Sequence, residues 1–273
     1  MQASRTWTPP TGTLGGIVAE ARQRAQVLAA QEHTLAREAT ARRPGRSLAA
    51  ALTGLNVAVV AEIKRRSPSK GWIKPGLAAA DTARAYEAGG AAAVSVLTEP
   101  KHFGGSVDDL IAARDNITIP VLKKDFHIEP IQLLEARALG ASAALLIARA
   151  LSPDELRRLA LAARDLALEV LIEVRDEEEL ARAMECDPSM IGVNNRNLET
   201  LAIDAAMSER LIGMIPRTVV AVMESGVTSR ADVERAARIG ADAVLVGSAM
   251  SAADDATAAV KALTGVPRVL RAG

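Results

Sequence analysis

From residue 57 onward, short apolar runs alternate with longer segments that have the spacing of amphipathic helices. The apolar runs have the length of buried strands, and they lie at 57–64, 92–98, 120–125, 143–148, 169–174, 190–195, 218–224 and 243–247. The helical segments lie at 80–88, 106–115, 129–139, 152–166, 176–186, 204–214 and 229–239. Strands that are apolar throughout indicate a parallel sheet covered on both faces. We therefore predict an α/β fold, a single (β/α)8 TIM barrel; an open doubly wound sheet is the alternative, because strand number alone does not prove closure.

The ends of the predicted helices carry matching signals. Three helices run into the next strand through glycine followed by alanine, at residues 89–91, 140–141 and 240–241. Glycine commonly follows a helix because it adopts the left-handed conformation without strain. Ser152 and Ser229 stand where helices are predicted to begin, as N-cap residues do. These repeated signals support one continuous barrel.

The N-terminal part of the chain has no strand period. Residues 14–35 carry a single apolar stripe with helical spacing. A basic turn follows, and a second, short apolar helix is predicted for 47–55. We predict a helical extension over residues 1–56, packed on a catalytic barrel domain of residues 57–273.

Composition and charge exclude several classes of function. The 273-residue chain is 49% hydrophobic and balances 33 basic against 33 acidic residues, so no overall field attracts nucleic acid. Cys186 is the single cysteine, and no His/Cys/carboxylate cluster has the spacing of a metal site. The longest apolar stretch, 138–148, is too short to span a bilayer, and no signal peptide heads the chain. We predict a cytoplasmic protein, expected to be a monomer, with no metal, no organic cofactor and no nucleic-acid or membrane partner.

Polar residues gather where the predicted strands end. Glu62 and Lys64 lie two positions apart, so their side chains point to the same side of the sheet. Such a pair in an apolar strand is costly unless it is partnered or functional; a solvated pair on an edge strand is the alternative. The other strands end in Thr98 and Glu99, Lys124 and Asp125, Glu173, Asn194 and Arg196, Glu224 and Ser225, and Gly247 and Ser248. In a (β/α)8 barrel the active site lies at these C-terminal strand ends, so we take these residues as the candidate functional set.

The last two strand ends predict an anion site. Glu224-Ser225-Gly226 follows the seventh strand, and Gly247-Ser248 follows the eighth with a helical segment beyond it. These positions in (β/α)8 barrels frequently hold phosphate through backbone N–H groups and a short helix N-terminus. The expected partner is a small phosphorylated substrate.

Longer motifs give the chain a more specific resemblance. They are EIKRRSPSKG at 62–71, SVLTE at 95–99 with FGGS at 103–106, PVLKKDF at 120–126, EARALGA at 135–141, LIEV at 171–174, IGVNNRNL at 191–198 and ESGV at 224–227. In this combination and order, over about residues 57–250, the chain resembles the indole-3-glycerol-phosphate synthase family. The N-terminal helical extension resembles that of the family as well. A generic phosphate-binding barrel would share only the last motif.

The resemblance implies a carboxy-lyase of tryptophan biosynthesis. The reaction would close 1-(2-carboxyphenylamino)-1-deoxyribulose 5-phosphate to indole-3-glycerol phosphate, with loss of carbon dioxide and water. The aniline ring carbon must attack a ketone, and a lysine in a dry pocket can neutralise the developing alkoxide. By resemblance, Lys124 is this general acid. Glu173 is the candidate for the dehydration, which needs a carboxyl group with a raised pKa.

Other strand-end residues would support these two groups. Glu62 and Asn194 would orient the substrate hydroxyls and the reacting lysine, and Glu224 would support them. Lys64 would hold substrate negative charge, with a share in proton transfer. Arg196 would meet the substrate carboxylate, for which a planar guanidinium is favourable.

The remaining candidate residues would bind the two ends of the substrate. The phosphate is assigned to Ser67, Ser225, Gly226, Gly247 and Ser248. The benzene ring is assigned to an apolar slot of Phe103, Phe126 and Leu198, although the two phenylalanines could be ordinary core residues.

Several residues near the motifs are expected to have no role in the chemistry. His102 and His127 are assigned to surface or loop positions, and Lys70, Lys101 and Arg65 to solvated loop charges. The loop from 65 to 76 is a candidate mobile lid. Trp72, His127, Ile131 and Met223 depart from the family pattern, which affects the expected shape of the pocket rather than the reaction.

Two other functions remain open at this level. An Amadori-type isomerase would share the phosphate site but would need a carboxylic acid/base pair rather than Lys124. A non-catalytic phosphate binder would keep Gly247-Ser248 without turnover. Glu173 and Glu224 could likewise be structural ion-pair partners at the barrel mouth.

Overall fold

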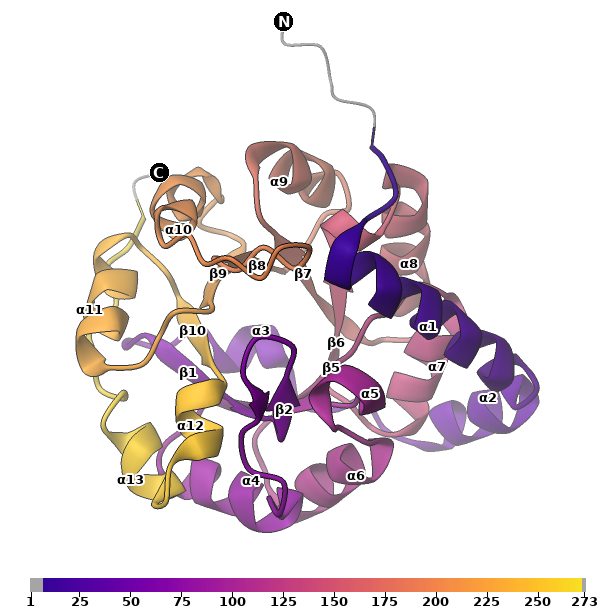
Figure 1. Cartoon of the computed structure of the whole chain (residues 1–273), viewed down its shortest axis with the longest axis horizontal. Helices are drawn as coiled ribbons and strands as arrows, with labels where there is room; N and C mark the ends of the chain where they lie inside the picture. The colour runs from indigo at the N-terminus through magenta and orange to yellow at the C-terminus, as the bar shows by residue number, and fades with distance from the viewer. Residues whose placement is uncertain (1–6, 272–273) are drawn as a thin grey trace, which may run out of the picture.

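The computed structural model describes residues 7–271 and contains a closed barrel of eight parallel strands (Figure 1). The strands are β1 (Ala58–Ile63), β4 (Ala93–Leu97), β5 (Val121–Lys124), β6 (Ala143–Ile147), β7 (Glu169–Val174), β8 (Met190–Asn194), β9 (Val220–Glu224) and β10 (Ala243–Val246). Each strand pairs with the next along the chain, and β1 pairs with β10 to close the barrel. The predicted (β/α)8 barrel is confirmed, and the open sheet is ruled out.

The helices cover the outside of the barrel between successive strands. The longer ones are α4 (Ala79–Ala88), α6 (Val107–Asn116), α7 (Pro130–Ala138), α8 (Pro153–Asp165), α9 (Glu177–Met184), α10 (Ala206–Leu211), α11 (Arg230–Arg238) and α13 (Ala256–Lys261). Ser152 and Ser229 accept hydrogen bonds from the third backbone N–H group of their helices, as expected of N-caps. Gly90, Gly140 and Gly240 have positive φ angles at the turns into the next strands.

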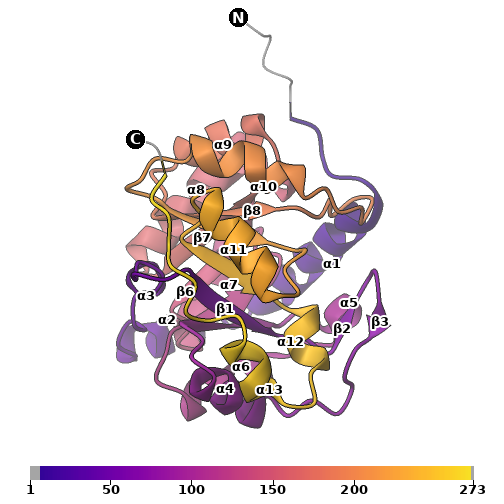
Figure 2. The ribbon, with the colours of Figure 1, turned by 90° about the vertical axis from the view of Figure 1, so that its left-hand side faces the viewer.

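Short elements at the strand ends complete the structure. They are α5 (Pro100–Phe103), α12 (Ser248–Ala252) and the 3-10 turns η1 (Ala148–Ala150) and η2 (Ile212–Met214). Residues 66–72, expected as an irregular loop, form the antiparallel hairpin of β2 (Arg66–Ser67) and β3 (Gly71–Trp72). In Figure 2 this hairpin and α5 lie at one end of the barrel, and α3 lies at the other. Whether the hairpin moves as a lid stays a prediction.

The N-terminal segment forms three helices rather than the two predicted. The expected helix over 14–35 is divided into α1 (Gly12–Ala29) and α2 (Glu32–Ala41), and α3 (Leu48–Ala51) is shorter than expected. The division lets α2 pack on α7, where Leu35 and Ala39 contact Ala138 in a small second apolar cluster. Helix α1 belongs instead to the main core, which it joins through buried side chains such as Leu14. The domain boundary at residue 56 stays a prediction.

No helix within residues 7–271 has both the length and the apolar character needed to cross a membrane.

Arg271 ties the end of the chain to the strands β9 and β10. Its buried guanidinium donates to Asp242 at 2.7 Å and to the carbonyl oxygens of Gly240, Val219 and Ile215 at 2.7, 2.7 and 3.1 Å. The second oxygen of Asp242 accepts from the partly exposed Arg268 at 2.9 Å. The buried carbonyl groups next to the strands therefore depend on one side chain for their hydrogen bonds.

We predict that Arg271→Met lowers the free energy of unfolding by about 3 kcal/mol, because it leaves a buried carboxylate and several carbonyl groups short of donors. Arg268→Met, which removes the more exposed partner of the same carboxylate, should cost less than about 1 kcal/mol. Urea unfolding followed by circular dichroism measures both values. Equal costs for the two variants would contradict this account of Arg271.

Candidate active site

One cavity at the C-terminal mouth of the barrel, of about 250 Å³, contains all the candidate catalytic and substrate-binding residues. Its walls include Glu62, Lys64, Ser67, Phe103, Lys124, Phe126, Glu173, Asn194, Arg196, Leu198, Glu224, Ser225, Gly226, Gly247 and Ser248. They come together because parallel strands in a closed barrel all end at the same rim.

Lys124 lies at the centre of this cavity between two carboxylates. Its Nζ is 3.0 Å from Glu224 Oε2 and 3.4 Å from Glu173 Oε2. The other oxygen of Glu173 accepts from Asn194 Nδ2 at 2.9 Å. All four side chains are buried, and each comes from a different strand, β5, β7, β8 or β9. A single positive charge therefore holds the acidic groups of neighbouring strands together.

Glu62 and Lys64 form a second ion pair in the same cavity. Lys64 Nζ lies 2.6 Å from Glu62 Oε1, as expected for two residues on the same side of a strand. Burial would raise the pKa of Glu62, but Lys64 and then Lys124 outweigh this effect, and the pKa is lowered. Since Lys64 is paired and part-buried, the solvated edge-strand alternative is wrong.

The two carboxylates that share Lys124 do not have equal surroundings, and Glu224 has a raised pKa. Glu62 pairs with Lys64 instead. Burial raises the pKa of Glu224 to about 7, and Glu173 adds to this effect while Lys124 opposes it. Burial disfavours the Lys124 ammonium, but Glu224 and Glu173 outweigh it and raise the pKa of Lys124. The lysine therefore stays protonated at neutral pH. The Glu224 carboxyl group takes up or releases its proton near pH 7.

Two glycines make room for these carboxylates. A Cβ atom on Gly192 would lie 2.1 Å from Glu224 Oε1, and one on Gly247 would lie 2.3 Å from Glu62 Oε1. Either methyl group would displace a carboxylate of the cavity. Gly247 was assigned to phosphate from the sequence alone, and Gly192 was missed because its role is to leave space on the neighbouring strand.

The turn after β9, where the phosphate site is expected, has an unusual backbone. Ser225 and Gly226 both have φ angles in the left-handed region, 64° and 84°. Phosphate binding at this turn stays a prediction. Asn195, which was missed from the sequence, donates to the carbonyl oxygen of Ser225 at 3.0 Å and thereby holds this turn. Lys70 also lines the cavity and is not only a solvated loop charge as predicted.

The apolar side of the cavity includes the predicted aromatic slot. The rings of Phe103 and Phe126 pack with their centroids 6.1 Å apart, and Leu198 lies in the same wall. Ile17 and Thr13 of α1 also line the cavity. They were missed because the helical stripe in the sequence indicates a buried face without showing what covers it.

Arg196 is directed partly away from the expected carboxylate site. Its Nη1 donates to the carbonyl oxygen of Leu201 at 2.9 Å, although the side chain still lines the cavity. The loop that carries Arg196 and Leu198 is held to the start of α1, because Glu199 accepts from the backbone N–H of Thr11 at 2.7 Å.

The opposite face of β5 carries a buried polar network that the sequence did not reveal. Asp125 accepts from Arg24 of α1 at 2.8 Å and from Thr98 at 2.6 Å. Lys123 Nζ lies 3.4 Å from both Asp125 and His127. Burial would raise the pKa of Asp125, but Lys123 and Arg24 lower it strongly. Lys124 does not pair with Asp125, in agreement with their opposite directions along the strand.

His127 and Arg65 have surroundings different from those predicted. His127 lies in the loop after β5, one of the two kinds of position predicted, but it is buried rather than exposed, with Nδ1 2.8 Å from the carbonyl oxygen of Leu145. Burial, with the help of Lys123, lowers its pKa to about 3, so the ring is neutral. Arg65 forms an ion pair with Asp109 and donates to Leu77 rather than standing free in solvent.

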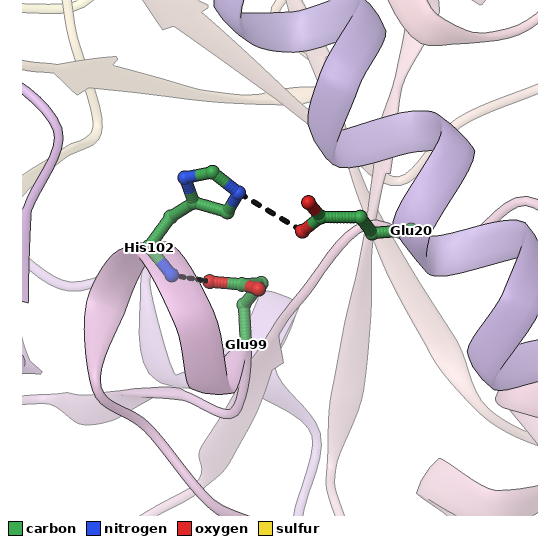
Figure 3. A group of neighbouring side chains, drawn as sticks. All are labelled: Glu20, Glu99 and His102. Atoms are coloured by element: carbon green, nitrogen blue, oxygen red, sulfur yellow. Dashed lines mark hydrogen bonds and ion pairs between the residues drawn. The ribbon is translucent and has the colours of Figure 1, made fainter.

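Within residues 7–271, one group of side chains has the spacing of metal ligands: Glu20, Glu99 and His102 (Figure 3). Glu99 is buried and accepts from the backbone N–H groups of residues 101, 102 and 103. Glu20 pairs with Lys101 and, at 3.0 Å, with His102 Nε2. These oxygen atoms already have donors, so the group fastens α1 to α5.

The fold and this cavity define a (β/α)8-barrel enzyme whose acid–base groups are lysines and carboxylates. A family model described as indole-3-glycerol phosphate synthase matches residues 14–263. The chain belongs to that family.

Individual comparisons agree with this placement. The chain is 45% identical over 257 residues to "Indole-3-glycerol phosphate synthase 2" of Streptomyces coelicolor, with 93% of this chain and 100% of the relative covered. It is 50% identical over 208 residues to a Nocardioides relative named indole-3-glycerol phosphate synthase, with coverages of 76% and 80%. A solved thiamine phosphate pyrophosphorylase from Pyrococcus furiosus shares the fold at a TM-score of 0.56 and 16% identity, covering 78% of this chain and 95% of that one.

We predict that Glu224 makes stability fall as pH rises from 5 to 8. Its pKa is raised from 4.5 to about 7 by folding, so its stabilising contribution is complete below 4.5 and is lost as pH rises through 7. Glutamine does not titrate, so Glu224→Gln should not lose stability in this way. The unfolding free energy of the variant minus that of wild type should therefore rise by on the order of 2 kcal/mol between pH 5 and pH 8. Urea unfolding at successive pH values measures it.

Glu62→Gln provides the matched control, because the pKa of Glu62 is lowered by folding. The stability that Glu62 contributes is lost only when pH falls below the ordinary pKa of a carboxyl group. The difference in unfolding free energy between Glu62→Gln and wild type should therefore stay constant between pH 5 and 8. A constant difference for Glu224→Gln as well would contradict the raised pKa.

Proposed function

We propose that this protein closes 1-(2-carboxyphenylamino)-1-deoxyribulose 5-phosphate to indole-3-glycerol phosphate, with loss of carbon dioxide and water. The observation that carries the proposal is a buried lysine between two carboxylates, 3.0 and 3.4 Å away, in a cavity that is also lined by Phe103, Phe126 and the turn at Ser225 and Gly226. Each part of the substrate then has a counterpart in the cavity.

Ring closure depends on Lys124. The aniline ring carbon attacks the ketone carbon, and negative charge develops on the ketone oxygen. Because its carboxylate neighbours raise the pKa of Lys124, the ammonium is present to donate a proton to that oxygen. Phe103 and Phe126 would hold the ring in place by apolar contact, which favours the geometry of attack.

Loss of carbon dioxide restores the aromatic ring, and dehydration completes the indole. Glu173 is proposed to remove the proton from carbon and to deliver a proton to the leaving hydroxyl. The hydrogen bond from Asn194 to Glu173 fixes the orientation of this carboxyl group. Glu62 and Glu224 would keep the two lysines in position.

The two charged ends of the substrate are assigned to different residues of the cavity. The phosphate would lie on Ser225, Gly226, Gly247, Ser248 and Ser67. The carboxylate would lie near Lys64 and Arg196, whose positive charges would attract it. The guanidinium of Arg196 would exchange its bond with Leu201 for one with the substrate.

The two other functions considered have no observation in their favour. An aldose–ketose isomerase would place a carboxylic acid/base pair at the centre of the cavity, where Lys124 lies. We also propose that the enzyme works as a monomer in the cytoplasm without a metal or organic cofactor.

We predict that Lys124→Ala lowers kcat at least about 1,000-fold and that Glu173→Gln lowers it about 100-fold or more, in the range expected for a general acid or base. Indole fluorescence measures product formation from the carboxyphenylamino substrate. Circular dichroism establishes that the variants are folded.

Lys261→Ala, at the end of α13 and away from the cavity, controls for loss of a lysine. It should retain wild-type turnover. Unchanged rates for both Lys124→Ala and Glu173→Gln would refute the residue assignments, and a wild-type protein that forms no indole product would refute the function.

A further inference from the structure

A second cavity, of about 160 Å³, is lined by Glu173 together with residues of η1, the start of α9 and the loop after β8, and Glu224 is not in its lining. It shares Ile147, Glu173, Arg196 and Leu198 with the active-site cavity. Glu173 therefore stands in the wall between the two cavities. Nothing in the proposed binding of substrate uses this second space.

The second cavity is strongly polar. Its ionisable lining residues are Arg149, Glu173, Arg175, Asp176, Glu179, Arg196 and Glu199. Arg149 and Glu199 form an ion pair at 2.9 Å with both side chains partly exposed, so the cavity reaches the surface there. A polar cavity of this volume has room for several water molecules. Arg175 also has a buried Nε with no hydrogen-bond partner in the described part of the chain, which suits a hydrated site.

Glu179 is the carboxyl group at the buried end of this space. It lies in the first turn of α9, is 4% exposed, and accepts from the backbone N–H of Arg175 at 2.8 Å. Burial and the neighbouring Asp176 raise its pKa to about 7, against the opposing effects of the Arg175 N–H, Arg182 and Arg149. The carboxyl group therefore exchanges protons with solvent near neutral pH.

The proposed reaction needs such exchange, because it consumes one proton in each turnover. The substrate carboxylate leaves as neutral carbon dioxide, and the ketone oxygen leaves as water. Lys124 gives one proton to the ketone oxygen. The dehydration then takes one proton from carbon and gives one to the leaving hydroxyl, so it neither gains nor loses a proton overall. Lys124 is left as a neutral amine and must recover a proton from solvent.

We propose that the second cavity is the route for this proton and that Glu179 passes it to Glu173. The inference rests on the proposed function. A proton leaves the Glu179 carboxyl group, crosses water in the cavity to the Glu173 carboxylate, and moves from Glu173 Oε2 to Lys124 Nζ, 3.4 Å away. Solvent then returns a proton to Glu179. This route approaches Glu173 from the second cavity, so it does not pass through the space assigned to substrate.

In this proposal Glu179 acts through Glu173 and does not touch the substrate. Glu179 also accepts a backbone hydrogen bond at the start of α9, so the test has to distinguish proton transfer from this structural role. Glutamine keeps the oxygen that accepts from the Arg175 N–H but cannot donate a carboxyl proton. Glu179→Gln is therefore the informative variant. Glu178→Gln is the matched control, because it removes an acid from the same helical turn outside the cavity.

The test compares single and multiple turnovers by indole fluorescence. Lys124 already carries its proton when the first substrate binds, so Glu179→Gln should leave the single-turnover rate at the wild-type value. Its steady-state kcat at pH 8 should be about tenfold lower with unchanged KM, a smaller loss than that of a group acting directly on substrate. Imidazole, a small proton donor, should restore part of the rate, and Glu178→Gln should behave as wild type.

The other outcomes overturn the proposal. A Glu179→Gln variant with wild-type steady-state kcat from pH 6 to 9 refutes the relay alone. Equal losses in single and multiple turnovers, without rescue by imidazole, identify Glu179 as a structural cap only. A wild-type protein without any turnover refutes the proposed function itself, and the relay with it.

Discussion

The site depends on one buried ammonium group. Lys124 is placed in the mouth of an apolar barrel, where removal of its charge from water is costly unless carboxylates surround it. Glu173 and Glu224 supply that charge from β7 and β9, and Gly192 leaves the space that the second carboxylate needs. Burial, with Glu173 close by, raises the pKa of Glu224. The same arrangement that stabilises the lysine therefore prepares an acid–base site.

The alternation of β5 places a second charged network on the other side of the same strand. Lys124 faces the cavity and Lys123 faces the helices, because successive side chains point to opposite faces; Asp125 follows directly after the strand. Asp125 is anchored by Arg24 and Thr98, and its carboxylate also accepts from the backbone N–H of Phe126 at 2.8 Å. The backbone on both sides of Asp125 is thus held from outside the barrel. This network therefore limits the freedom of the strand end that carries Lys124.

Strand ends could be predicted from the sequence, and contacts between distant segments could not. The apolar runs mark where each strand stops, and closure of the barrel brings Glu62, Lys124 and Glu224 together without further information. Arg24 was not predicted as the partner of Asp125, because one residue lies on a helix and the other on a strand about a hundred positions later. The burial of His127 was not predicted for a similar reason: it depends on Lys123 and on a carbonyl oxygen of the next strand.

The two cavities beside Glu173 suggest why the acid–base groups are arranged in a row rather than in a cluster open to solvent. Bound substrate would cover Lys124 and exclude water from it, which strengthens the action of the ammonium group. The same cover would block the direct path by which solvent could protonate the amine again. A carboxylate that faces substrate on one side and a hydrated polar cavity on the other satisfies both requirements. Glu173 has this position, held by Asn194 and close to Lys124. The wall of the barrel between β7 and β8 then separates the path of the proton from that of the substrate.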